Sequence, residues 1–365
     1  MNRLVRSRIE SELRALGLAP RVDKTRGCND GRCAEVENVV ATITGRAAEP
    51  NAKALVLVCH YDSVPTGPGA SDDGAGVAAL IEVARALTQG DPVDRDVVLL
   101  FDDGEEQGLL GADAFLREAP EAARIGVVIN VEARGTRGPS MMFESKNARL
   151  GAVSVMGRAL PRPVTSSLFA GVYERMPNDT DLSVFGRAGH VGFNFAFIRG
   201  LEHYHRMSDN LAQLDLGSLQ HHGDNVLAMV RAFGGRAVLL GRADGDARAV
   251  WFDLLSLVVI AWPEWMSLPL SAAVLGIGLL ATKRNVSAAR SALWIGAVSV
   301  LVSLIFPEGS YLLVVPGCLL SSGLAAAALA PSASQRIVDM TAFVTTFAAG
   351  AIGFEILLGL RDVLV

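Results

Sequence analysis

Charged residues are spread very unevenly along this 365-residue sequence. Of its 33 basic and 38 acidic residues, only 11 lie between residues 249 and 365. A bilayer core excludes charged side chains, so a long segment with this composition is typical of membrane-spanning chain. We therefore predict two parts, a water-soluble domain over residues 1–245 and a multi-span membrane region over residues 249–365.

The predicted membrane region contains four long apolar stretches. They are Trp265–Thr282, Ser291–Pro307, Gly309–Pro331 and Met340–Leu360. Each approaches the roughly 20 residues that a helix needs to cross the bilayer core. A shorter fifth stretch, Ala249–Trp262, contains Asp253 and stops before Pro263. The sequence thus predicts four to five transmembrane helices and a lipid bilayer as partner. The alternative, buried core helices of a large soluble protein, fits the regular repetition of charge-free runs less well.

The basic residues of this region predict its orientation. Lys283, Arg284 and Arg290 share one connecting loop and Arg336 lies in another, so both loops are expected on the cytoplasmic side. As a helix, residues 249–262 would rise about 20 Å, less than the ~30 Å core. If this stretch lies in the interface or kinks into the next span, the soluble domain is extracytoplasmic, in a periplasm or lumen. If it crosses alone, the domain is cytoplasmic. We favour the extracytoplasmic arrangement.

The N-terminal segment does not supply an export signal. MNRLVRSRIESELRALGL has no apolar core of the kind that signal peptides contain, and it predicts an amphipathic helix ending at Gly17. Either the N-terminus of the soluble domain is truncated in this sequence, or the predicted topology is wrong. Because the sequence stops just after an apolar run, we also expect the membrane region to be incomplete at its C-terminus.

Within residues 1–245, apolar runs alternate with helical patterns. Predicted strands are Val36–Ile43, Ala54–Cys59, Val97–Phe101, Gly126–Val131 and Val191–Phe197. Predicted helices are Gly74–Leu87, Leu109–Arg117, Ala148–Arg158 and Leu211–Leu240. Several strands are apolar on both faces, which is typical of a sheet covered by helices on both sides. The alternation predicts an α/β fold, in which functional sites gather at the carboxyl ends of strands.

Carboxylates and imidazoles follow these predicted strands. They are His60 and Asp62, Glu105 and Glu106, Glu132, and then His203, His205 and Asp209, with Asp72 and Asp73 preceding a helix. Oxygen and imidazole ligands suit Zn²⁺, Co²⁺ or Mn²⁺. Each piece has a simpler interpretation, because His60 and Asp62 could form a turn, Asp72 and Asp73 could cap a helix, and the two glutamates could be solvated. Their joint placement at four strand ends favours a metal site.

These residues lie in segments that resemble a known family. VCHYDSVPTGPGASDDGAGVAALIEVAR, LLFDDGEEQGLLGADAF, VINVEARGTRGPSMMFE, PNDTDLSVF and LEHYHRMSDN follow one another between Val58 and Asn210. Together they resemble the two-zinc aminopeptidase-like metallopeptidases. The nearest likeness is to the membrane-embedded branch that contains vacuolar membrane protease and the endoplasmic reticulum metallopeptidases. The resemblance implies an α/β fold with a mixed central sheet flanked by helices, a peptide substrate and two Zn²⁺ per chain.

The resemblance also implies a role for each matching residue. His60 and Glu132 would bind one metal, Glu106 and His205 would bind the other, and Asp72 would bridge the two through a cis peptide bond to Asp73. Asp62 would orient the imidazole of His60, and Glu105 would be the general base. His205 fits the family motif better than its neighbour His203. Arg206 stands where relatives commonly have Thr, which leaves the substrate preference open.

Two other classes of function compete with a metal-dependent aminopeptidase. One is a non-catalytic receptor or scaffold of the same fold, against which the complete ligand set argues. The other is a related amide hydrolase or a glutaminyl cyclase, and cyclases of that kind use one zinc. A nucleic-acid partner is not expected, because the net charge is −5.

The four cysteines do not form a disulfide scaffold. Cys28 and Cys33 lie close in the sequence and either pair, as an extracytoplasmic location would allow, or remain two free thiols. Cys59 in a buried strand and Cys318 in an apolar stretch are expected to be inert.

Overall fold

A computed structural model describes residues 2–47, 52–235 and 246–273, together with residues 300 and 304. The chain divides into two compact units. The first comprises residues 1–165, 173–246 and 253–259, and the second comprises residues 166–172, 247–252 and 260–365. The chemistry predicted from the sequence falls entirely in the first unit.

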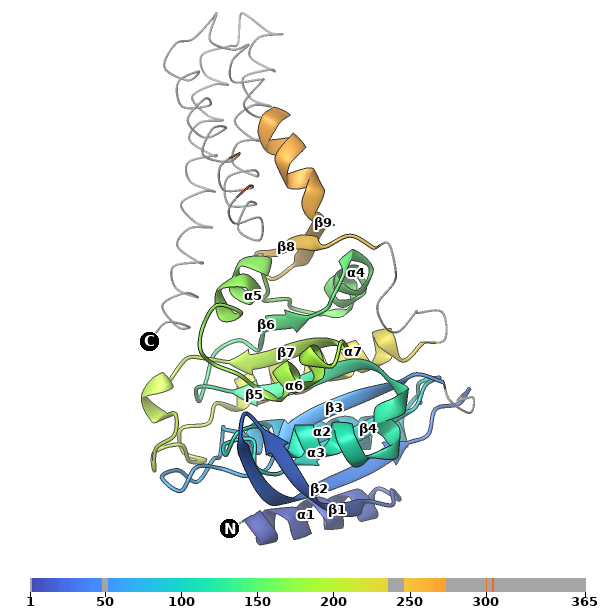
Figure 1. The fold of residues 1–365 in the computed structure, drawn as a ribbon, viewed down its shortest axis with the longest axis vertical. Helices are drawn as coiled ribbons and strands as arrows, with labels where there is room; N and C mark the ends of the chain where they lie inside the picture. The colour runs from blue at the N-terminus through green and yellow to red at the C-terminus, as the bar shows by residue number, and fades with distance from the viewer. Residues whose placement is uncertain (1, 48–51, 236–245, 274–299, 301–303, 305–365) are drawn as a thin grey trace, which may run out of the picture. The chain divides into compact units, whose positions relative to one another are not determined.

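Figure 1 shows the elements in chain order. The helices are α1 (Asn2–Ala15), α2 (Gly74–Gln89), α3 (Leu110–Glu118), α4 (Leu150–Ala159), α5 (Ser167–Tyr173), α6 (Asp181–Arg187) and α7 (Leu216–Phe233). The strands are β1 (Arg21–Asn29), β2 (Arg32–Ile43), β3 (Ala54–His60), β4 (Val97–Asp102), β5 (Ile125–Ala133), β6 (Met141–Lys146), β7 (Val191–Phe197), β8 (Ala249–Leu254) and β9 (Val258–Pro263). Three short 3-10 helices are η1 (Pro120–Arg124), η2 (Leu201–His203) and η3 (Glu264–Met266).

The first unit is built on a seven-stranded sheet with the order β1-β2-β4-β3-β5-β7-β6. Its centre, β4-β3-β5-β7, is parallel, and β1, β2 and β6 pair in antiparallel fashion outside it. Every residue of β3, β4, β5 and β7 is buried. Their apolar character on both faces therefore identified them correctly as central strands. The predicted mixed α/β sheet flanked by helices is confirmed.

Helices cover both faces of this sheet (Figure 1). On one face, α3 and α6 contribute Phe115 and Phe185 to a cluster with Val56, Val58 and Leu100 of the central strands. On the other face, α2 and α7 lie side by side and contact β5. Their packing leaves the carboxyl ends of β3, β4, β5 and β7 at one edge of the sheet, where the polar residues follow.

The N-terminal amphipathic helix is confirmed as α1. Ile9 and Leu13 on its apolar face are buried. Gly17 ends the helix with a left-handed φ of +80°, and the amide of Leu18 donates to the carbonyl of Leu13 at 3.1 Å. This is the glycine-terminated helix end expected from the sequence.

Strands β1 and β2 form a hairpin. The predicted strand Val36–Ile43 is confirmed as the second part of β2, whereas β1 and the turn were not predicted. Its turn residues, Asp30 and Gly31, both have positive φ, which is the backbone that Asp-Gly favours in two-residue hairpin turns. Cys28 and Cys33 face each other across the hairpin and form a disulfide. The sequence left open whether these two cysteines pair or remain free thiols, and in the structure they are paired. Cys59 is buried in β3 as a free thiol, and Cys318 lies outside the described residues.

The helix predicted over Leu211–Leu240 is shorter in the structure. Helix α7 begins after Asp215, whose carboxylate accepts a hydrogen bond from the amide of Ser218 at 2.7 Å. This cap fixes the start, and residues 211–213 form a turn instead. Residues 236–240 lie outside the described residues.

Residues Ala249–Trp262, predicted as a fifth apolar helix, form the antiparallel hairpin β8–β9 instead. The prediction was wrong because the stretch was judged by its hydrophobicity alone. Its Val, Ile, Trp and Phe residues favour strands. The carboxylate of Asp253 accepts from the amide of Ser256 at 3.1 Å and so fixes the turn between the strands.

Most of the predicted membrane region lies outside the described residues. Of Trp265–Thr282, residues 265–266 end η3, residues 267–273 are helical, and residues 274–282 are not described. Ser291–Pro307 is described only at residues 300 and 304, and Gly309–Pro331 and Met340–Leu360 are not described at all. Among the described residues, no helix has both the length and the apolar character needed to cross a membrane. The spans and the division into residues 1–245 and 249–365 therefore stay predictions.

Candidate metal centre

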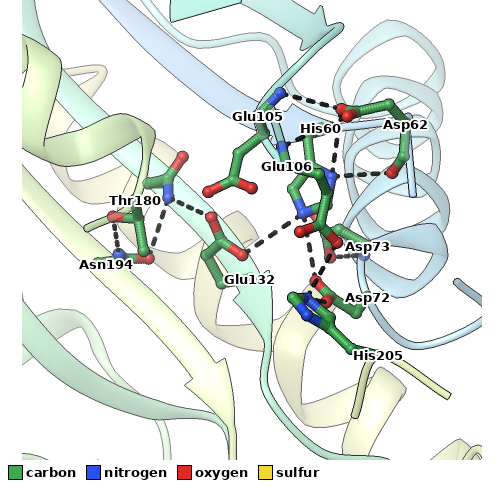
Figure 2. Close-up of polar contacts among 12 residues, drawn as sticks. His60, Asp62, Asp72, Asp73, Glu105, Glu106, Glu132, Thr180, Asn194 and His205 are labelled. Atoms are coloured by element: carbon green, nitrogen blue, oxygen red, sulfur yellow. Dashed lines mark hydrogen bonds and ion pairs between the residues drawn. The ribbon is translucent and has the colours of Figure 1, made fainter. Parts of the chain in front are cut away.

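The sheet brings the polar strand ends together. His60 is the last residue of β3 and pairs with Asp102, the last residue of β4, while β3 pairs with β5 on its other side. Glu105 and Glu106 follow β4 after a short turn, and Glu132 is near the end of β5. All of these side chains therefore project from one edge of the parallel strands, and Figure 2 shows how they converge.

His60, Asp72 and Glu132 form the first candidate metal group, and all three are buried. Nε2 of His60 lies 3.2 Å from Oδ1 of Asp72 and 3.7 Å from Oε2 of Glu132. Burial lowers the pKa of His60, but hydrogen bonds with Asp62, Asp72 and Glu132 outweigh it and raise that pKa well above the usual value. The imidazole of His60 thus faces the carboxylates of Asp62, Asp72 and Glu132. This excess of negative charge would favour the binding of a cation.

Asp72, Glu106 and His205 form the second candidate group. Nε2 of His205 lies 3.2 Å from Oδ2 of Asp72 and 3.1 Å from Oε1 of Glu106. Asp72 thus presents one carboxylate oxygen to each group, Oδ1 to His60 and Oδ2 to His205. His203 belongs to neither group among the described residues. The imidazole of the second group is that of His205, which the family motif favoured.

The spacing of the donor atoms fits bound ions. Ligands bonded tetrahedrally to zinc at about 2.0–2.1 Å lie roughly 3.3 Å apart, and the four donor pairs here are separated by 3.1 to 3.7 Å. Within the described part of the chain, Oε1 of Glu106 and Nε2 of His205 are both buried and form no hydrogen bond, although they lie 3.1 Å apart. Such atoms converge on a point between them, as the ligands of an ion do. The residues present therefore fit divalent cations.

Glu105 lies beside the two groups and belongs to neither of them. Its side chain extends toward the Glu132 side of the cluster in Figure 2. Burial raises the pKa of Glu105 well above the usual value, His60 opposes this, and the nearby carboxylates of Glu132 and Asp181 add to the increase. A carboxylate with a raised pKa is suited to accept a proton and hold it.

Asp62 acts through its backbone as well as its side chain. Nδ1 of His60 lies 3.0 Å from the carbonyl oxygen of Asp62 and 3.6 Å from its carboxylate. The carboxylate itself accepts hydrogen bonds from the amides of Glu105 at 3.1 Å and Glu106 at 3.3 Å. Asp62 therefore orients the imidazole and also fixes the turn that carries the two glutamates, a second role that the sequence did not indicate.

The loop before α2 is held in one conformation by several contacts. The peptide bond between Asp72 and Asp73 is cis, as the family resemblance implied. Asp73 caps α2 by accepting from the amide of Gly76 at 2.9 Å. Gly69 has a φ of +66°, and a Cβ at this position would lie 2.6 Å from the carbonyl oxygen of Asp72. Only glycine fits there, and this close approach places Asp72 between the two groups.

Asp209 is a positioning residue to which the sequence interpretation gave no role. Its carboxylate accepts hydrogen bonds from the amide of Ser71 at 2.9 Å and from that of Asp72 at 3.1 Å. It is buried and follows His205 by four residues, so it fastens the loop carrying His205 to the loop carrying Asp72.

Replacing Asp209 by Asn is expected to weaken zinc binding by about 10–100-fold, the usual effect of removing a group that orients ligands. The amide side chain of Asn keeps the shape of Asp209 but lacks the negative charge that attracts the backbone amides of Ser71 and Asp72. Zinc affinity would be measured by competition with a chromogenic chelator. Asp215→Asn, at the start of α7, is the matched control and should bind zinc normally. Equal affinities for the two variants would contradict this role.

Two buried asparagines, Asn130 and Asn194, form a hydrogen-bonded chain that ends on the carboxylate of Glu132. Nδ2 of Asn130 donates to Oε1 of Glu132 and to Oδ1 of Asn194, each at 3.2 Å. Asn194 in turn donates to Oε2 of Glu144 at 2.9 Å. Asn130 precedes Glu132 by two residues in β5 and so faces the same side of the sheet. That two-residue spacing within a strand is the sequence signal that could have found this support.

An aromatic side chain, that of Tyr204, packs against His205 of the second group. The ring of Tyr204 stacks on the ring of His205 with 3.7 Å between the centroids, and the guanidinium of Arg134 lies 5.2 Å from the centre of the Tyr204 ring. His205 has a φ of 56°, a left-handed conformation that is uncommon outside glycine. The stack fixes the imidazole in this strained conformation, with Nε2 toward Asp72.

Zinc binding is expected to strengthen as the pH rises from about 6.5 to 9. Burial lowers the pKa of His205, but the carboxylates of Asp72 and Glu106, 3.2 and 3.1 Å from its Nε2, raise that pKa to about 9 in the protein without ions. Because that folded-state pKa exceeds the unfolded one, the proton stabilises the apo-protein below pH ~6.5 and this contribution disappears as the pH rises through 9. A cation must displace the proton.

Calorimetry of zinc binding at pH 7.5 in buffers of different ionisation heats measures this displacement. We expect release of at least about one proton per chain, and less release above pH 9. Binding whose heat is the same in every buffer would contradict a protonated His205.

Comparison with known proteins links this chain to one family. Residues 38–230 match Peptidase family M28, a range that includes every residue of the two groups. Endoplasmic reticulum metallopeptidase 1 of Rattus norvegicus is 31% identical over 234 residues, which cover 62% of this chain and 26% of that protein. Vacuolar membrane protease of Yarrowia lipolytica is 29% identical over 291 residues, which cover 74% of this chain and 28% of that protein. The chain thus spans about a quarter of the length of these relatives.

Among solved structures, glutaminyl cyclase of Porphyromonas gingivalis superposes with a TM-score of 0.50 at 21% identity. The match covers 62% of this chain and 88% of that chain. At this level of identity, the similarity shows a shared fold.

Proposed function

The chain belongs to peptidase family M28, and from this premise we propose that it is a two-zinc exopeptidase of the aminopeptidase type, acting on peptides. The observation that carries the proposal is the position of Asp72. Its two carboxylate oxygens face two different groups of donors, one with His60 and Glu132 and one with Glu106 and His205. A carboxylate shared in this way is the arrangement that two neighbouring ions require.

The side chains divide the reaction between them. When bound, two cations supply polarisation of the scissile carbonyl and acidify the attacking water. Glu105 then accepts the proton of that water on its carboxylate and delivers it to the nitrogen of the leaving amine. Its raised pKa supports this role, because the proton is held between the two steps. Asp62 keeps Glu105 in place through the backbone amides of the turn.

Two alternatives are separated from this proposal by one experiment. A receptor or scaffold of the same fold would not hydrolyse peptides, and a cyclase or amide hydrolase that uses one zinc would bind a single ion. The zinc content of the purified chain would be measured together with turnover of aminoacyl amides, N-acylated dipeptides and N-terminal glutaminyl peptides. Two zinc ions with hydrolysis of substrates that have a free amino terminus is the expected result. One ion with cyclisation, or no turnover, would overturn the proposal.

We further propose that the chain is an integral membrane protein, with residues 1–245 as the catalytic domain outside the cytoplasm and residues 249–365 as the membrane region. The disulfide between Cys28 and Cys33 supports an oxidising compartment, a periplasm or lumen. The names of the relatives, which refer to the endoplasmic reticulum and to a vacuolar membrane, agree with association with a bilayer. The lipid bilayer is thus a proposed partner beside the peptide substrate.

A further inference from the structure

The turn of the β8–β9 hairpin has residues that its backbone does not favour. Leu255 and Ser256 form this two-residue turn with φ values of 53° and 54°, and the amide of Leu257 donates to the carbonyl of Leu254 at 3.0 Å. Turns of this kind favour Asn, Asp and Gly, since other residues are strained at positive φ. Folding alone therefore does not account for a leucine at Leu255.

The hairpin between β1 and β2 provides a comparison within the same molecule. Its two-residue turn also has positive φ at both positions, 46° and 78°, but it is made by Asp30 and Gly31. The chain thus uses the favoured residues at one such turn and leucine with serine at the other. The exception coincides with the exposed apolar surface on the second hairpin.

Four apolar side chains surround the turn and face outward. Leu255 and Leu257 are 75% and 78% exposed, and Leu254 and Val258 are 40% and 48% exposed. Between Leu254 and Pro263 the sequence contains no charged residue. We refer to Leu254, Leu255, Leu257 and Val258 as the hairpin tip. Exposed apolar clusters of this kind mark surfaces that are covered by a partner.

The position of the hairpin tip in the sequence indicates which partner covers it. Trp265, the first residue of the first predicted membrane-spanning stretch, follows Val258 by seven residues. Three of the four tryptophans, Trp251, Trp262 and Trp265, lie within this short part of the chain, and tryptophan is enriched where proteins meet the membrane–water interface. A soluble protein partner would normally meet a polar rim, whereas residues 254–258 offer only apolar and hydroxyl side chains, and the neighbouring carboxylate of Asp253 accepts a hydrogen bond from the amide of Ser256.

We propose that the hairpin tip inserts into the interfacial layer of the lipid bilayer, an inference that rests on the proposed membrane location of the chain. Insertion removes the four apolar side chains from water, which offsets the strain of placing leucine at Leu255. The surface carries no cation, so the contact depends on the acyl chains rather than on headgroup charge. The soluble unit would then be fixed to the membrane surface by a second point besides the spans.

A depth measurement on the full chain tests this. Leu257→Cys, in a chain with Cys318→Ala, would be labelled with an environment-sensitive fluorophore and reconstituted in phosphatidylcholine nanodiscs. We expect blue-shifted emission and strong quenching by lipids brominated near the headgroup end of the acyl chain. Leu4→Cys, at a residue 79% exposed on α1, is the matched control and should respond to aqueous iodide alone.

Two results would overturn the proposal. Quenching of the label at position 257 by iodide and not by brominated lipid would place the hairpin tip in water. Shielding from both quenchers would mean that protein covers it, either another segment of this chain or a second copy.

A second variant separates the membrane contact from folding. Leu255→Asn combined with Ser256→Gly gives the turn the residues its backbone favours, so the unfolding midpoint should stay constant or rise. Quenching of the label by brominated lipid should fall several-fold, while turnover of a soluble peptide stays unchanged. A lower unfolding midpoint with undiminished lipid quenching would show that Leu255 serves folding and not the membrane contact.

Discussion

Replacing Glu105 by Gln is expected to lower kcat for peptide hydrolysis by about 10²–10⁴-fold, the contribution of a general base. Gln has nearly the same shape but cannot accept a proton from water. The zinc content should not change, because Glu105 belongs to neither group of candidate ligands. The backbone amide of residue 105 would still donate to Asp62, so the turn should keep its conformation.

Turnover and zinc content would be measured on the same preparation of this variant. Glu82→Gln, a surface glutamate of α2 paired with Arg85, is the matched control and should retain full activity. Full turnover by Glu105→Gln would eliminate the proposed base. A loss of zinc in step with activity would instead make Glu105 a ligand.

Replacing Asp72 by Ala is expected to remove zinc from both groups and to reduce turnover to the background level. Asp72 is the one residue shared by both candidate groups among the described residues. Its pKa is lowered, because the imidazoles of His205 and His60 beside its carboxylate outweigh the effect of burial, so it contributes a negative charge at neutral pH. Without that charge, each group keeps only one carboxylate and one imidazole.

The zinc content of this variant should fall from two ions per chain to fewer than one. The unfolding temperature should also lose its dependence on added zinc, a stabilisation of about 4 kcal/mol when zinc exceeds its dissociation constant 1,000-fold. Asp91→Ala, an exposed aspartate in the segment after α2, should keep both ions. Two ions bound to Asp72→Ala would contradict the bridging role.

The two variants fail in different ways, and this distinction identifies the reaction class. Glu105→Gln should keep the ions and lose the proton transfer, whereas Asp72→Ala should lose the ions first. A receptor that holds zinc for structural reasons would also lose its ions in the Asp72→Ala variant. It would have no peptide turnover, so Glu105→Gln would have no measurable effect on it.

The centre of the sheet was predicted well because buried parallel strands have a clear signature in a sequence. Strands β3, β4, β5 and β7 are apolar on both faces, and the polar residues that follow them stand out against that background. Since parallel strands end at one edge, the order of apolar runs and polar ends is enough to place His60, Glu106 and Glu132 in one neighbourhood.

The outer strands of the sheet were missed because they lack the continuous apolar character of the central strands. Strands β1 and β6 are the two outermost strands, and β1 is rich in charged residues, as edge strands often are, with Arg21, Asp23, Lys24 and Arg26 among its first six positions. The Asp-Gly pair between Cys28 and Cys33 was the available signal for the first hairpin. At β8–β9 the composition matched a membrane segment, and strand propensity was not weighed against it.

The contacts of Asp62 and Asp209 with backbone amides could not be predicted from sequence alone, although the family resemblance implied that Asp62 orients His60. Both accept hydrogen bonds from backbone amides, and every residue except proline offers such a donor. Which amides lie within reach depends on how two distant loops meet. The contacts of Asp209 with Ser71 and Asp72 span 138 and 137 residues of chain.

This long span has a consequence for the protein as a whole. The ligands come from separate strands and loops between residues 60 and 205, so no short fragment of the chain carries a complete set. Zinc would therefore act as a cross-link between remote parts of the sequence. Partly folded chains would have little affinity for it, and loading would take place only after the sheet has assembled.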